Sequence, residues 1–121
     1  MNETGERRDL RERTKALALR IIRLFASLPK TTEAQVLGKQ VLRSGTSPGA
    51  HYREAHRARS TAEFISKIEA GLQELEEMAY WLDLLAESRI LSEKRLAPLR
   101  TEVAELTKIF ASVAMSAKKK R

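Results

Sequence analysis

Apolar residues recur with the periodicity of an α-helix along four separate segments of this chain, at alternating intervals of three and four residues in the two clearest. The clearest series is Ile65, Ile68, Leu72, Leu75, Ala79 and Leu82. A second is Leu96, Leu99, Val103, Leu106, Phe110 and Val113, and two more lie within residues 10–28 and 36–42. No segment alternates apolar and polar residues as a half-buried strand does. The pattern therefore predicts an all-α protein.

Capping and helix-breaking residues divide these four series. Pro29 ends the first helix, because proline cannot continue the hydrogen-bond ladder. Thr32 with Gln35 and Ser60 with Glu63 both have the spacing of a capping box. Helix starts are predicted after Thr31 or Thr32, after Ser60 and after Ser92. Short connections between four helices predict an antiparallel, up-and-down four-helix bundle.

The second helix contains an interruption. Gly45, Thr46, Ser47, Pro48 and Gly49 follow one another inside it. Ser47 as N-cap with Pro48 at the first helical position would restart a helix. We therefore expect residues 32–57 to form one helical path with a kink or short break at 44–48.

Length and composition favour one domain. The 121 residues suffice for one hydrophobic core, which we place in residues 1–115, with residues 116–121 as a basic disordered tail. The chain has no cysteine, so disulfides and thiolate metal sites are excluded. It has no run of apolar residues long enough to cross a membrane, and its first residues are charged rather than signal-like. We expect a cytoplasmic protein with no membrane association.

The net charge of +7 is unevenly distributed. Residues 59–89 carry seven acidic against three basic residues. The candidate nucleic-acid-binding residues are Arg53, Arg57 and Arg59, around the turn between the second and third helices, and Lys118, Lys119, Lys120 and Arg121, at the end of the sequence. Such groups bind phosphates and release counterions. They are equally compatible with solvated helix faces and pairing between neighbouring side chains.

Ser44, Ser47, His51 and Glu54 form a polar seam, spaced so that all four share one helix face. One interpretation is a buried network that fixes helix register. The other is that the seam borders a pocket or binding groove. A small-molecule pocket lined by Ser44, His51 and Glu54 is a further possibility.

No motif predicts catalysis, a cofactor or a metal. His51 and His56 are the only histidines, neither follows a glutamate by three residues, and their separation directs them away from one ion. The polar seam has no oxyanion hole, and the glycines at 45 and 49 lack the lysine of a phosphate-binding loop. We expect no catalytic residue, no metal site and no cofactor.

The middle of the chain closely resembles the bacterial four-helix-bundle proteins encoded in intervening sequences of 23S rRNA genes. The resemblance rests on Ser44, Ser47, Pro48, Gly49, Ala50, Tyr52, Arg53, Glu54, Ala55, Ser60, Glu63, Phe64, Lys67, Glu74 and Tyr80-Trp81-Leu82. The family commonly has Asn where this chain has His51. The resemblance implies an up-and-down bundle that assembles as a homopentamer without a catalytic site. It also extends to the accessory protein of diversity-generating retroelements, a basic pentamer that binds nucleic acid and a reverse transcriptase.

These observations favour a non-enzymatic, oligomeric bundle that binds RNA or another nucleic acid through phosphate contacts. Self-association is also indicated by the third helix, which is apolar well beyond its main stripe at Phe64, Met78, Trp81, Leu84 and Leu85. The alternative is a scaffold that docks a protein partner, such as a reverse transcriptase or a ribosomal component. Salt-sensitive retention on RNA separates the first function from stoichiometric co-purification of a protein, which indicates the second.

Overall fold

The computed structural model describes the backbone of residues 3–120 and the side chains of residues 9–120. It contains four helices, α1 (Glu3–Ala26), α2 (Thr32–Ala55), α3 (Thr61–Glu87) and α4 (Glu93–Lys120). No strand occurs among the described residues. The predicted all-α fold is confirmed.

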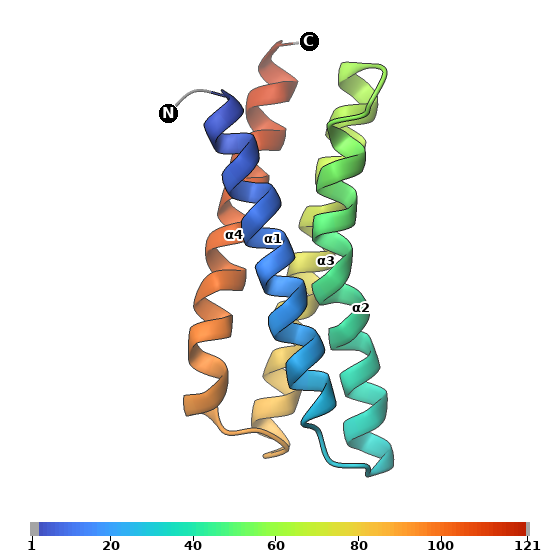
Figure 1. The fold of residues 1–121 in the computed structure, drawn as a ribbon, viewed down its shortest axis with the longest axis vertical. Helices are drawn as coiled ribbons and strands as arrows, with labels where there is room; N and C mark the ends of the chain where they lie inside the picture. Colours follow the sequence, from blue (N-terminus) through green and yellow to red (C-terminus); the bar gives the residue numbers. More distant parts are fainter. Residues whose placement is uncertain (1–2, 121) are drawn as a thin grey trace.

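The helices lie side by side along one long axis, and the chain reverses direction at each connection (Figure 1). The α1–α2 and α3–α4 connections lie at one end of the bundle. The α2–α3 connection lies at the opposite end, together with the start of α1 and the end of α4 (Figure 1). We call the latter the open end, because it holds both ends of the described chain.

The predicted apolar series form the core. Ile21, Leu75 and Leu106 are fully buried, each from a different helix. Burying one such side chain contributes about 1.5–3 kcal/mol, so burial of these apolar series is the main favourable contribution to folding.

The starts of α2, α3 and α4 are all capped by hydroxyl side chains, and for α4 the cap is Ser92, which accepts a hydrogen bond from Arg95 N, as predicted. Ser60 accepts a hydrogen bond from Glu63 N, as predicted for α3. For α2 the cap is Thr31, which accepts from Ala34 N. The expected box between Thr32 and Gln35 does not form, because the Gln35 amide instead donates to the carbonyl of Pro29.

The expected break at 44–48 does not occur, because α2 is continuous from Thr32 to Ala55 with Pro48 inside it. Ser47 therefore caps nothing. The hydroxyls of Ser44, Thr46 and Ser47 each donate to the carbonyl one turn earlier in the same helix. Such back-bonding keeps these residues inside a helix and bends helices elsewhere. A kink at this point stays a prediction.

The glycines of α2 mark where it packs closely on α1. A Cβ on Gly45 would lie 2.6 Å from Ile21 Cγ1, and one on Gly38 would lie 2.5 Å from Leu28 Cδ1. Both distances are shorter than van der Waals contact. Gly45 and Gly49, the glycines that suggested a break, thus lie against Ile21 and Thr14 of α1.

The end of α4 also differs from the prediction. The helix continues to Lys120, so residues 116–120 are helical where a disordered tail was expected beyond 115. Lysines in the last turn favour this continuation, because they compensate the negative end of the helix dipole.

Candidate nucleic-acid interface

The open end of the bundle brings together two groups of basic residues that are distant in sequence. Arg53 lies in the last turn of α2, and Arg57 and Arg59 lie in the connection to α3. Lys118, Lys119 and Lys120 form the last turn of α4, which reaches the same end (Figure 1). Arg121 lies outside the described residues. The topology thus places six of the seven predicted phosphate-binding residues at one end.

Most of these cations are available to an external anion. Arg53, Arg57, Arg59, Lys119 and Lys120 are exposed. Within the described part of the chain, none of them forms an ion pair. Unpaired charges of one sign at one end raise the local potential and attract polyanions.

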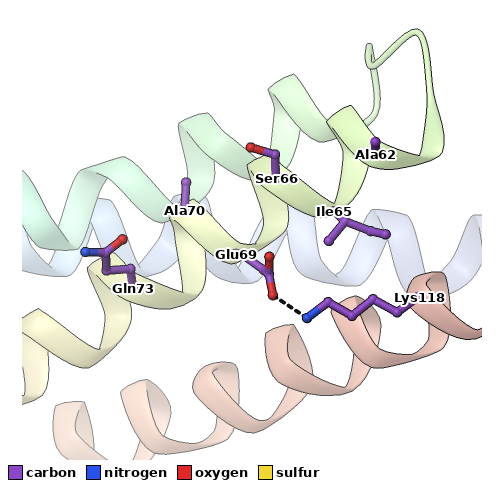
Figure 2. Close-up of a pocket in the computed structure, with 7 residues that line it drawn as sticks. All are labelled: Ala62, Ile65, Ser66, Glu69, Ala70, Gln73 and Lys118. Carbon is purple, nitrogen blue, oxygen red and sulfur yellow. Dashed lines mark hydrogen bonds and ion pairs between the residues drawn. The ribbon is translucent and has the colours of Figure 1, made fainter.

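Lys118 is the exception in this group. Its Nζ lies 2.6 Å from Glu69 Oε2, so the side chain reaches from α4 across to α3 (Figure 2). Figure 2 also shows the shallow groove along α3 that this pair borders, with the small side chains of Ala62, Ser66 and Ala70. The Lys118 charge is partly neutralised, and we assign it a smaller part in binding than its neighbours.

The polar seam is not a buried network. Ser44 is fully buried, but its hydroxyl donates to the Gln40 carbonyl of its own helix. His51 Nδ1 lies 3.0 Å from Glu54 Oε1 near the surface, and Glu54 is also 3.8 Å from Lys67 Nζ. Only His51 and Glu54 are joined within the seam. Neither the groove beside Lys118 nor the cavity at the open end is lined by seam residues.

The electrostatics near the seam instead involve an ion-pair cluster between α2 and α3. Arg43 Nη1 donates to both carboxylate oxygens of Glu74 at 2.8 Å, and Nη2 donates to Glu77 at 3.0 Å. Burial opposes ionisation of Glu74, but the hydrogen bonds from Arg43 and the Arg43 charge hold its pKa below the usual value. The hydrogen bond to Glu74 in turn raises the pKa of Arg43. This cluster joins α2 to α3, and its one cation, Arg43, is already paired with carboxylates.

A similar contact joins α1 to α4. Arg13 donates to Glu102 at 2.6 Å and to Glu105 at 3.1 Å. The hydrogen bond to Glu102 raises the pKa of Arg13, although burial opposes the shift. The Arg13 charge is therefore already paired with carboxylates of α4.

A cavity of about 610 Å³ opens at the same end. Its walls come from all four helices and include Leu10, Tyr52, His56, Phe64 and Val113, with Arg59 and Lys120 at its edge. The sequence pattern does not predict this cavity. In an up-and-down bundle the end of α2, the start of α3 and the end of α4 lie at one end, but this topology does not determine whether their side chains leave a space there.

The described residues support neither a metal site nor a membrane-spanning helix. No group of three or more His, Cys, Asp or Glu side chains is placed to hold a metal ion. Among the described residues, no helix has a segment both long and apolar enough to span a bilayer.

Comparisons with known proteins agree with this architecture. Residues 6–112 match the family described as 23S rRNA-intervening sequence protein. A crystal structure from Bacteroides thetaiotaomicron, described as a protein of unknown function from the S23 ribosomal protein family, is 33% identical. It superposes with a TM-score of 0.85 over 90% of this chain and 97% of the other. No curated protein matches. The match over most of its length shows that the chain belongs to the 23S rRNA-intervening sequence protein family.

Proposed function

We propose that this protein is a non-enzymatic, cytoplasmic, self-associating bundle that binds RNA through phosphate contacts at its open end. The carrying observation is that Arg53, Arg57, Arg59, Lys119 and Lys120 all lie at one end of the bundle, on exposed positions without an ion pair among the described residues. Each such cation that neutralises a phosphate adds affinity by counterion release, without reading sequence.

Self-association strengthens this proposal. The family resemblance implies a homopentamer, and a ring of copies would repeat the open end around one axis. Repetition raises the local density of positive charge and allows several weak phosphate contacts to act together. We therefore expect structured RNA to be held by more than one copy.

The test is RNA affinity across a salt series for two triple variants that each remove three charges. The first changes Arg53, Arg57 and Arg59 to Gln. The matched control changes Lys30, Lys39 and Lys94, which are exposed at or near the opposite end, to Gln. We expect the first to bind more weakly and to reduce the salt slope by about 0.7–0.9 for each phosphate that is no longer neutralised. The control should bind as the unchanged protein does.

Equal weakening in both variants would contradict the assignment to the open end, since it would indicate a diffuse effect of net charge. No RNA binding at low salt would overturn RNA binding itself. Stoichiometric co-purification of a reverse transcriptase or ribosomal component by such a protein would favour the scaffold function instead. Melting temperatures of both variants verify that the bundle is intact.

A further inference from the structure

The cavity at the open end combines an aromatic wall with a cationic edge. The aromatic wall is a chain of ring contacts that begins in the core. Phe110 and Tyr52 have ring centroids 6.0 Å apart, Tyr52 and His56 4.5 Å, and His56 and Phe64 5.7 Å. The chain ends at Phe64, which is half-buried and lines the cavity. Edge-to-face packing fixes the orientation of such rings.

The edge of the cavity has groups that favour an anion. Arg59 and Lys120 line it, and both are exposed and unpaired within the described chain. Thr61, the first residue of α3, also lines it. The first N–H groups of a helix have no partner inside the helix and lie at the positive end of its dipole. Cations and this helix start thus face the same space.

The volume matches a ligand larger than an inorganic anion. Cavities of about 300–1,000 Å³ are typical for small organic ligands and cofactors, and this one measures about 610 Å³. A bare phosphate would occupy the edge and leave the apolar wall of Leu10, Phe64 and Val113 in contact with water. An apolar ligand would leave Arg59 and Lys120 without a partner. A nucleotide provides both a phosphate and a flat aromatic base.

We propose that this cavity binds one unpaired nucleotide, with its phosphate at Arg59, Lys120 and the start of α3 and its base against Phe64. Insofar as the nucleotide belongs to an RNA strand, this inference rests on the proposed function. It adds a preference that phosphate contacts alone do not give. Unstacked bases of single strands can enter an aromatic pocket, whereas bases within a duplex cannot.

The first experiment follows NMR signals of the full-length protein during titration with adenosine 5′-monophosphate, ribose 5-phosphate and inorganic phosphate. We expect adenosine monophosphate to shift signals of Phe64, His56 and Val113 together with those of Arg59 and Thr61. Ribose 5-phosphate and phosphate should shift only the signals at the cationic edge. Equal effects of all three compounds would overturn the role of the base.

A pair of conservative variants tests the aromatic wall. Phe64→Leu removes the ring from the cavity, and Phe25→Leu makes the same change at a half-buried phenylalanine on α1, near the opposite end. Stacking on an aromatic side chain is worth about 1–3 kcal/mol per base, so we expect Phe64→Leu to weaken single-stranded RNA binding by about tenfold. Duplex RNA binding should not change, and Phe25→Leu should change neither.

The two experiments separate failure of this inference from failure of the proposed function. Undiminished single-stranded RNA binding by Phe64→Leu, with no base-dependent NMR shifts, overturns the nucleotide pocket and leaves phosphate binding intact. Base-dependent shifts with adenosine monophosphate, but no binding of any RNA, support the pocket and overturn the RNA function.

Discussion

At the scale of single residues, Glu74 is the most tightly held carboxylate between α2 and α3. Its side chain is 13% exposed and accepts two hydrogen bonds of 2.8 Å from Arg43. These bonds favour the ionised form more than burial disfavours it, which lowers the pKa. A group with a lowered pKa in the folded state stabilises the fold only where it is ionised.

Glu74→Gln should therefore lower the free energy of unfolding by about 1 kcal/mol at pH 7. The deficit should be constant well above pH 4.5, the ordinary glutamate value. It should shrink as the pH falls below this value through the folded pKa, because the native carboxylate then takes up a proton as well. Urea unfolding at a series of pH values measures the difference.

Glu76→Gln is the matched control, because Glu76 is an exposed neighbour on α3 without an ion pair among the described residues. Its free energy of unfolding should stay within about 0.5 kcal/mol of the unchanged protein. A Glu74→Gln deficit that does not vary with pH would mean that poorer packing, rather than the missing charge, causes it.

Residue-scale prediction from the sequence succeeded where an interaction is local in the chain. The cap of α3 needs only Ser60 and the backbone three residues later, and it is present. The prediction of a buried network in the polar seam failed because a helix face shared by Ser44 and Ser47 does not determine what their hydroxyls bind. Both donate to carbonyls of their own helix, an option that the seam interpretation left out.

At the scale of helices, the close contact between α1 and α2 depends on glycines in α2, which have no side chain to keep the two helices apart. A Cβ on Gly45 would meet Ile21 at Cγ1, Cγ2 and Cβ, at distances of 2.6, 3.0 and 3.1 Å. Ile21 is fully buried and β-branched, so it has little freedom to move away. Alanine normally stabilises a helix interior by about 1 kcal/mol relative to glycine, but here it forces the helices apart.

We expect Gly45→Ala to destabilise the protein by about 1–3 kcal/mol, the usual effect of overpacking a core. In an Ile21→Ala background the same change should cost much less, because the three clashing atoms are reduced to one. Thermal or urea unfolding of the four proteins in this double-mutant cycle measures the coupling. Stabilisation by Gly45→Ala alone would show that the two helices are not in such close contact.

The sequence pattern located all four helices but misjudged the middle of α2. Glycine and proline within five residues usually interrupt a helix, and the expected break followed from that tendency. Tertiary packing overrides this tendency and keeps the helix continuous, since Gly45 and Gly49 face Ile21 and Thr14 of α1. Which helix a glycine faces depends on the fold, and the residues flanking it do not contain that information.

At the scale of the whole molecule, the placement of Arg53, Lys119 and Lys120 at one end follows from topology. An up-and-down bundle places the end of its second helix at the same end of the molecule as the end of its fourth (Figure 1). The individual residues were predictable from charge, and their location at a common end could have been deduced from the predicted order of helices. The cavity beside them was not predictable, because it depends on side-chain volumes from all four helices.

The surface of α3 carries an apolar area that one chain leaves partly uncovered. Tyr80 is 55% exposed, and its ring centroid lies 5.1 Å from that of Trp81. The indole N–H of Trp81 is buried and has no acceptor among the described residues. An unsatisfied buried donor costs about 1–3 kcal/mol. A neighbouring copy that covers Tyr80 could extend this apolar contact and supply the acceptor.

Tyr80→Lys should therefore reduce the proposed assembly to single chains, because it places a charge in the proposed apolar contact between copies. Light scattering over a range of protein concentrations measures the mass. Met115→Lys is the control, since Met115 is an equally exposed apolar residue, at 60%, on α4. Its mass should equal that of the unchanged protein. Retention of the full mass by Tyr80→Lys would place the contact between copies on a different face, and reduction by both variants would indicate that added charge alone disperses the assembly.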